Sequence, residues 1–129
     1  MNDDSSCPFC ALNDQRILFE NDAFVVARDG FPVSPGHTLI IPKHHTTSVF
    51  DLSPEAFISL REALHWAKTH LDQAFAPDSY NLGINDGPAA GQTVPHLHVH
   101  LIPRYHGDKP DPRGGIRWII PEKAKYWTD

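Results

Sequence analysis

Short apolar runs in the first third of the chain predict strands separated by polar or proline-containing breaks. Residues 17–19 and 24–27 are apolar runs on either side of Glu20-Asn21-Asp22, which predicts a short hairpin. The β-branched run at residues 38–41, closed by Pro42, predicts another strand. The chain therefore opens with the pattern of an antiparallel sheet.

A long helix is predicted from Ser53 to a point before Pro77. Ser53 can cap the first backbone N–H groups, Pro54 suits the first helical position, and Glu55 suits the positive end of the helix dipole. Apolar residues then recur at three- and four-residue spacing, which predicts one buried stripe. The stripe consists of Phe57, Leu60, Leu64, Ala67, Leu71 and Phe75.

Two further strands are predicted in the second half, at residues 79–85 and 96–102. The loop between them, residues 86–91, holds too much glycine and proline for regular structure. Strands interrupted by one long helix predict an α+β fold, with an antiparallel sheet of about five strands.

Composition adds the class of protein and excludes several others. The 129 residues are 40% hydrophobic and carry a formal net charge of −5, which argues against binding nucleic acid or an anionic membrane. The sequence shows no leader-like or membrane-spanning stretch, and two cysteines are too few for a disulfide scaffold. We therefore expect a cytoplasmic protein.

The length suits one domain over residues 1–129. Residues 1–6 are small and polar, and we expect them to be disordered. The tail at residues 106–129 holds aromatic and aliphatic residues such as Trp118 and Trp127. We expect it to pack on the domain or on a partner chain, because such residues rarely hang in water.

The segment His96-Leu97-His98-Val99-His100 carries the unusual chemistry. Alternation with a period of two would place three imidazoles on one face of a strand. Three interpretations follow: a polar face in solvent, a catalytic metal site, or covalent catalysis with one imidazole as nucleophile. The preceding Gly91-Gln92-Thr93 favours phosphoryl chemistry, because glycine-rich backbone N–H groups and neutral side-chain donors suit phosphate oxygens.

These motifs together resemble the histidine triad family. Residues 96–102 match its signature, and residues 35–45 match its upstream strand. Residues 85–95 and Pro103-Arg104 are most similar to the fragile histidine triad branch and its bacterial relatives. The resemblance implies a histidine triad fold with one long and one short helix, a nucleotide substrate and a homodimer.

The resemblance also implies roles for individual residues. His98 would attack the α-phosphorus and form a nucleotidyl-histidine intermediate, which water then hydrolyses to a nucleoside monophosphate. The other catalytic positions are His100, Gln92, Thr93 and His37. The substrate-binding positions are Asn85, Asp29, Phe9, Gly91 and Arg104. Asp29 could equally be a turn residue and Phe9 an ordinary core residue.

The pair Cys7 and Cys10 could be a redox pair, two inert residues or half of a zinc site. Some bacterial histidine triad proteins resemble the third arrangement, which implies a structural zinc ion on Cys7, Cys10, His45 and His96. The neighbouring His44 leaves the third ligand open by one position. Magnesium is the second metal that we expect, as a companion of the substrate.

The leading functional prediction is a hydrolase of the kind that cleaves diadenosine polyphosphates. A nucleoside phosphoramidase of the same family is the enzymatic alternative. A nucleotide-binding sensor module with little turnover is the alternative from another class. A metal-dependent hydrolase, with an ion on His96, His98 and His100, is the third.

Overall fold

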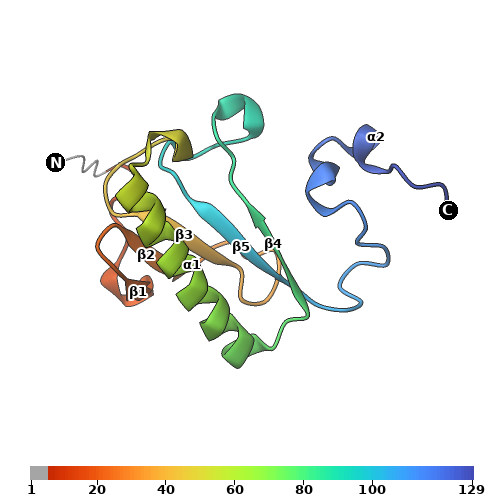
Figure 1. Ribbon diagram of the computed structural model, residues 1–129, viewed down its shortest axis with the longest axis horizontal. Coiled ribbons are helices and arrows are strands. Elements are labelled where there is room, and N and C mark those ends of the chain that lie inside the picture. The colour runs from red at the N-terminus through yellow and green to blue at the C-terminus, as the bar shows by residue number, and fades with distance from the viewer. Residues whose placement is uncertain (1–5) are drawn as a thin grey trace.

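The computed structural model describes residues 6–129 and contains a five-stranded antiparallel sheet with one long helix across one face (Figure 1). The strands are β1 (Ile17–Glu20), β2 (Phe24–Arg28), β3 (Thr38–Pro42), β4 (Ser79–Gly83) and β5 (Val99–Arg104), in the spatial order β1-β2-β3-β5-β4. The helices are α1 (Pro54–Phe75) and the short α2 (Pro121–Ala124). Short 3-10 turns are η1 (Asp14–Arg16), η2 (Val49–Asp51), η3 (Pro88–Ala90) and η4 (Gly115–Ile119).

This architecture confirms the α+β fold, with its five strands, one long helix and one short helix. Every pairing in the sheet is antiparallel, and the predicted hairpin of β1 and β2 is present. We expected residues 1–6 to be disordered. Residues 1–5 lie outside the described part of the chain, which begins at Ser6. Within residues 6–129, no helix is both long and apolar enough to cross a bilayer.

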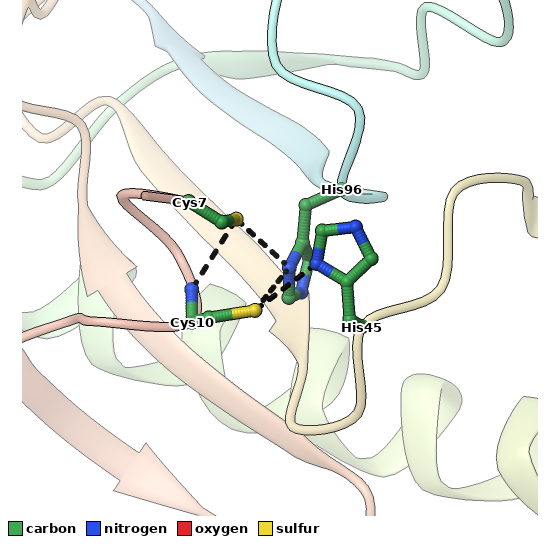
Figure 2. Close-up of side chains that lie close together, drawn as sticks. All are labelled: Cys7, Cys10, His45 and His96. Carbon is green, nitrogen blue, oxygen red and sulfur yellow. Dashed lines mark hydrogen bonds between the residues drawn. The ribbon is translucent and has the colours of Figure 1, made fainter. Parts of the chain in front are cut away.

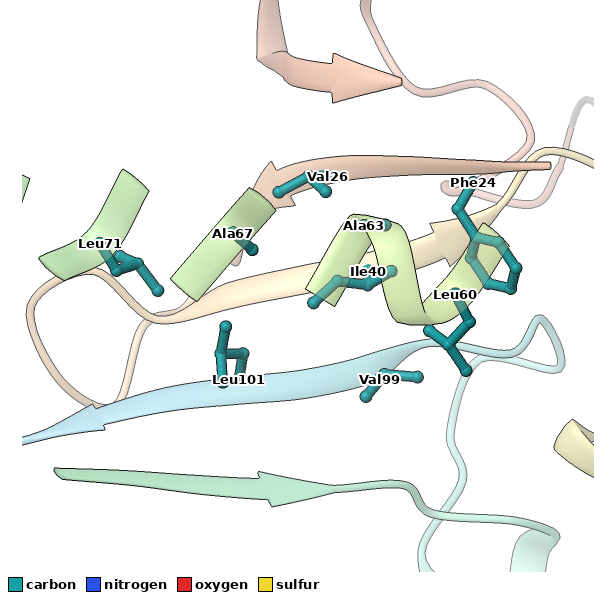
Figure 3. Close-up of a cluster of buried hydrophobic side chains, with 9 residues drawn as sticks. All are labelled: Phe24, Val26, Ile40, Leu60, Ala63, Ala67, Leu71, Val99 and Leu101. Atoms are coloured by element: carbon teal, nitrogen blue, oxygen red, sulfur yellow. The ribbon is translucent and has the colours of Figure 1, made fainter. Parts of the chain in front are cut away.

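Helix α1 begins as its sequence predicts, because the Ser53 hydroxyl accepts a hydrogen bond from the Ala56 N–H at 3.1 Å. Its inner side forms the main core with β2, β3 and β5 (Figure 3). The buried residues of that core are Phe24, Val26, Ile40, Leu60, Ala63, Ala67, Leu71, Val99 and Leu101.

The two ends of the predicted stripe are not buried. Phe57 is 46% exposed and Phe75 is 37% exposed, whereas Ala63, which the stripe did not include, is fully buried. Phe57 instead faces a groove that α1 forms with β4 and β5, which Leu82 and Leu101 also line. Phe75 is the last residue of α1 and lies close to Gly36 of the loop between β2 and β3.

The two later strands are shorter than predicted. β4 ends at Gly83 rather than residue 85, and β5 begins at Val99 rather than residue 96. The segment before β5 pairs elsewhere, because the Leu97 N–H donates to the Thr46 carbonyl at 2.6 Å. The expectation of three imidazoles on one strand face is therefore wrong, because His96 and His98 both precede β5 and only His100 lies on it. His96 is in addition fully buried.

The opposite face of the sheet carries a second apolar cluster, formed by Val25, Leu39 and Ile41. Phe9, Leu12 and Ile17 pack against it, so the segment before β1 covers this end of the face. Leu39 pairs with His100 across β3 and β5, which places His100 on the same face. The chemistry-bearing side of the sheet is thus the one that α1 leaves uncovered.

The tail after β5 runs beyond β4 and lies beside it, at the right of the view in Figure 1. It is held partly by its own contacts, since the Arg113 guanidinium lies 4.5 Å from the centre of the Trp127 ring. Near its start, the Tyr105 hydroxyl donates to the Pro35 carbonyl at 2.6 Å. η4 contacts β4.

Candidate functional site

Four side chains from three distant segments converge on one point. Cys7 and Cys10 come from the turn before β1, His45 from the loop after β3, and His96 from the segment before β5 (Figure 2). Their ligand atoms all lie within 4.8 Å of one another. The Nδ1 atom of His96 is 3.4 Å from the Cys7 sulfur and 3.5 Å from the Cys10 sulfur. The Nδ1 atom of His45 is 3.0 Å from the Cys10 sulfur.

This donor set fits a zinc ion. Tetrahedral zinc with bond lengths of about 2.3 Å to sulfur and about 2.0 Å to nitrogen separates neighbouring ligand atoms by about 3.3–3.8 Å. The Nε2–H of His96 donates to the Pro42 carbonyl at 2.9 Å, which leaves the Nδ1 lone pair directed at the thiols. Burial lowers the pKa of His96, an effect that the Pro42 carbonyl opposes, and so favours the neutral ring that a metal requires.

The ring of His98 is held in one tautomer. Its Nδ1 lies 2.8 Å from the backbone carbonyl of His96, and a carbonyl can only accept, so Nδ1 carries the hydrogen. In the neutral ring, Nε2 then carries the lone pair. A neutral imidazole with its Nε2 lone pair available is the state that a nucleophile needs.

The ring of His100 is held in the opposite tautomer by His37. The Val33 N–H donates to His37 Nδ1 at 3.1 Å, so the hydrogen of a neutral His37 ring is on Nε2. That nitrogen is 2.9 Å from His100 Nδ1, which must therefore accept, leaving the hydrogen of His100 on its Nε2. The Asp29 carboxylate lies 3.3 Å from His37 Nε2 and 3.9 Å from His100 Nδ1.

Burial keeps this pair of rings neutral near pH 7. It lowers the pKa of His37, against the raising effect of the Asp29 carboxylate. It also lowers the pKa of His100, with further lowering from the neighbouring His98 and His37. The His98 and His100 rings are edge to face at 5.1 Å. A lone pair on one ring and a donor on the next are thus side by side.

Comparison with known proteins identifies the family and the fold. A family model described as the HIT domain matches residues 11–107. The chain belongs to the HIT family. The sequence motifs predicted a nucleotide hydrolase or transferase of the histidine triad type. That prediction is confirmed at the level of the family.

Two curated relatives have named activities. The chain is 40% identical over 77 residues to a bis(5'-nucleosyl)-tetraphosphatase (asymmetrical) from Schizosaccharomyces pombe, covering 60% of this chain and 42% of that protein. It is 33% identical over 108 residues to an adenylylsulfatase from Arabidopsis thaliana, covering 81% of this chain and 55% of that protein. The chain thus spans about half the length of these two relatives.

A solved structure of similar size shares the fold. A zinc-bound histidine triad family protein from Mycobacterium smegmatis is 33% identical, with a TM-score of 0.71. The match covers 90% of this chain and 91% of that one. Together with the cluster of Cys7, Cys10, His45 and His96, this similarity supports metal binding by the present HIT chain.

The loop that precedes the triad is internally braced. The Gln92 side chain accepts from the Gly87 N–H at 2.8 Å and donates to the Thr47 carbonyl at 3.0 Å. Gly91 adopts a positive φ of 97°, which favours glycine there. Of the other loop positions expected at the site, Thr93 and Asn85 are exposed. The loop is therefore shaped by Gln92, with Thr93 at its surface.

Of the remaining expected site residues, Phe9 contacts His98, whereas Arg104 lies four residues beyond His100 on β5. Phe9 is next to His98, with ring centroids 4.9 Å apart. Arg104 is on β5, where Asp108 binds its guanidinium at 2.7 Å and 2.9 Å and Asn81 accepts at 2.7 Å. The contact with Asp108 raises the pKa of Arg104. Arg104 thus already has partners within its own chain.

Sequence reasoning missed the backbone groups that orient the imidazoles. The Pro42 carbonyl orients His96, and the Val33 N–H orients His37. Every residue supplies such groups, so no residue type in the sequence marks them. Sequence reasoning also missed the role of Asp86 in the loop before the triad. Its carboxylate accepts from the Ser48 hydroxyl and the Val49 N–H, each at 3.0 Å, and so anchors that loop.

Proposed function

We propose that the protein cleaves dinucleoside polyphosphates at the α-phosphorus in two displacements. In the first, Nε2 of His98 forms a bond to phosphorus, and the bond from phosphorus to the bridging oxygen breaks. The remaining nucleotide leaves with that electron pair. In the second, water attacks the nucleotidyl-histidine, the P–N bond breaks, a nucleoside monophosphate leaves and a proton goes to solvent. Two moderate barriers replace one high barrier.

One observation carries the proposal, namely the opposite tautomers of adjacent rings. His98 presents a lone pair on Nε2, while His100 presents an N–H on Nε2. Attack by the first ring raises negative charge on the non-bridging oxygens, where a donor from the second ring stabilises it. His37 supports the reaction from behind by maintaining the tautomer of His100.

The other site residues of the proposal remain those expected from the motifs. Gln92 would donate toward the leaving oxygen once its bonds within the loop open, and Thr93 would contact the phosphate. The groups proposed to bind the substrate are Asn85, Asp29, Phe9, Gly91 and Arg104. The named activity of the Schizosaccharomyces pombe relative supports a polyphosphate substrate.

A second candidate has a specific observation in its favour. The Arabidopsis thaliana relative is named an adenylylsulfatase, so an adenylyl group with a different leaving group is the alternative substrate. A phosphoramidate would use the same attack by His98. Comparing kcat/KM for diadenosine tetraphosphate, adenosine phosphosulfate and adenosine phosphoramidate ranks the three leaving groups directly.

The test of the proposed function is His98→Ala. We expect turnover to fall by at least about a thousandfold, while nucleotide affinity stays within a few-fold. The matched control is His106→Ala, because His106 is an exposed histidine of the tail. Acid-quenched single turnovers with labelled substrate should show a nucleotidyl adduct on the parent protein and none on His98→Ala.

Three outcomes contradict the proposal. A His98→Ala protein within tenfold of the parent rate rules out His98 as nucleophile. A parent protein that binds nucleotide tightly and forms no adduct is a sensor module. Loss of the rate in chelator, with restoration by a divalent ion that His96, His98 and His100 together hold, indicates the metal-dependent hydrolase.

We also propose a structural zinc ion on Cys7, Cys10, His45 and His96. It supports the fold and takes no part in the bond changes, which confines the chemistry to His98 and His100. Magnesium has no support among residues 6–129. The other cluster of possible ligands, Asp29, His37 and His100, offers one carboxylate with two imidazoles, and magnesium prefers oxygen ligands.

A homodimer is the assembly that we propose. The outer edge of β4 has no neighbouring strand in the described sheet. Beside it, a groove of about 400 Å³ between α1 and β4 is lined by apolar side chains that include Phe57, Leu64 and Leu82. A second copy would cover both the strand edge and the groove.

We keep residues 1–129 as one domain, and the cytoplasmic location stays a prediction.

A further inference from the structure

Phe9, which lies between the two cysteines, contacts the ring of the proposed nucleophile. Its ring centroid is 4.9 Å from that of His98, with the planes inclined by 59°. The same ring meets His96 edge to face at 5.8 Å. Phe9 also packs against the second apolar cluster of the sheet. A residue of the metal-binding turn therefore lies directly against His98.

The turn that carries Phe9 is tied to the rest of the protein through its cysteines. Within the turn, the Ala11 N–H donates to the Cys7 carbonyl at 3.1 Å and the Cys10 N–H donates to the Cys7 sulfur at 3.4 Å. Outward from the turn, the sulfurs meet His45 and His96 (Figure 2). A zinc ion held by these four ligands would crosslink the turn to the two segments that carry the histidines.

His98 is restrained on three sides, and two of the restraints begin at the Cys₂His₂ cluster. Its Nδ1–H donates to the carbonyl of His96, whose own side chain is a member of the cluster. One side of its ring meets Phe9, and the edge-to-face contact with His100 supplies the third restraint. The hydrogen bond sets where Nδ1 lies, and the ring contacts limit rotation of the imidazole plane.

We propose that the Cys₂His₂ centre positions the nucleophile, and that Phe9 is the positioning residue through which it acts. Ligation holds the turn so that Phe9 fixes the ring plane of His98, while ligation of His96 steadies the carbonyl that fixes its tautomer. The inference rests on the proposed attack by His98. It gives Phe9 a role that is separate from lining a base pocket.

The experiment uses the full chain carrying zinc, with Phe9→Ala, Phe9→Leu and the control Leu12→Ala. Leu12 packs against the same apolar cluster as Phe9. We expect Phe9→Ala to keep one zinc per chain and to slow nucleotidyl transfer to His98 by about ten- to a hundredfold in single turnovers, with KM within threefold. Phe9→Leu should recover part of the rate, and Leu12→Ala should stay within threefold of the parent.

Substrate choice separates positioning from base binding. If Phe9 positions His98, Phe9→Ala should slow nucleotidyl transfer by the same factor with diadenosine tetraphosphate as with diuridine tetraphosphate. If Phe9 only lines the base pocket, Phe9→Ala should instead change KM, and by different factors for the two substrates. The second result overturns the proposal.

A readout that needs no turnover tests the same contact. In ¹⁵N spectra of the imidazoles, His98 of the parent protein should show one Nδ1–H tautomer, and Phe9→Ala should show tautomer exchange or broadening. An unchanged His98 signal in a folded, zinc-loaded Phe9→Ala protein overturns the proposal. If the parent protein forms no nucleotidyl adduct at all, the proposed function fails. The ¹⁵N spectra still decide whether Phe9 positions the His98 ring.

Zinc removal supplies the second arm. In chelator-treated protein that stays folded by circular dichroism, His98 should lose its single tautomer. Without zinc, nucleotidyl transfer in Phe9→Ala should be less than twofold slower than in the zinc-free parent. Fully additive effects of zinc removal and Phe9→Ala overturn the link between them. If the zinc-free chain unfolds, the comparison of zinc-loaded Phe9→Ala and Phe9→Leu still decides the role of Phe9.

Discussion

At the residue scale, the role of each imidazole follows from what its second ring nitrogen meets. His96 donates from Nε2 to the Pro42 carbonyl and so offers Nδ1 to the cysteines. His98 donates from Nδ1 to the His96 carbonyl and so offers Nε2. Two residues of one type in one motif thus present different ring nitrogens, because fixing one ring nitrogen determines the state of the other.

Acid sensitivity of the fold is the prediction that belongs to this scale. Burial holds the pKa values of His37 and His100 below the ordinary 6.5, so the unfolded chain takes up protons that the native chain excludes. Stability is therefore fully present above pH 6.5 and is lost as pH falls toward the native pKa values. Urea titrations between pH 7.5 and 5.5 should show the free energy of unfolding falling with pH.

The matched comparison is His37→Gln, which keeps a donor for His100 and removes one titrating ring. Its free energy of unfolding should fall less steeply over the same pH range, because one fewer group takes up a proton on unfolding. Parallel curves for the parent and His37→Gln would show that His37 does not contribute.

At the element scale, the loop between β2 and β3 is coupled to α1 through a glycine. Gly36 has a φ of 87°, and a Cβ placed there would lie 3.0 Å from Cδ2 of Leu71 and 3.2 Å from the Phe75 ring. The loop can therefore approach the helix only without a side chain at this position. The same loop ends at His37, so this close approach also helps to place the buried imidazole.

Gly36→Ala and Gly107→Ala separate backbone strain from crowding. Gly107 has the same φ of 87° with open space around its missing Cβ. We expect Gly107→Ala to lower the free energy of unfolding by about 1 kcal/mol and Gly36→Ala by about 2 kcal/mol or more, because crowding against α1 adds to the strain. Urea denaturation measures both, and equal losses would show that Leu71 and Phe75 yield without cost.

At the scale of the whole molecule, the chain presents an apolar groove and an unpaired strand edge side by side. Leu82 of β4 is 48% exposed and Phe57 of α1 is 46% exposed, and both line the groove. Exposed edges of this kind invite pairing with another strand, and a twofold arrangement closes such an interface on itself. The geometry is that expected of one half of a symmetric interface.

Sedimentation analysis should therefore find a dimer that Leu82→Asp dissociates, since the substitution would place a charge in the proposed apolar interface. Phe31→Asp is the matched control, because Phe31 is 91% exposed and does not line the groove. A monomeric parent protein at micromolar concentration would contradict the proposed assembly. So would a Leu82→Asp protein that remains dimeric.

Local patterns predicted the order and class of the elements well. Ser53 and Pro54 mark the start of α1, and the apolar runs mark β1, β2 and β3, because capping and alternation depend on residues close together in sequence. The candidate chemistry was also visible, since the spacing of the cysteines and of the histidines is a sequence property.

Only the tertiary structure decided how these groups divide the work. It chose His45 over His44 for the cluster, separated buried His96 from His98 and His100, and placed Phe9 against His98. Each of these depends on segments dozens of residues apart meeting at one end of the sheet. It depends equally on backbone groups that every residue type supplies. Residue identity thus determined which chemistry was available, and the packing of distant segments determined which atom of each side chain could perform it.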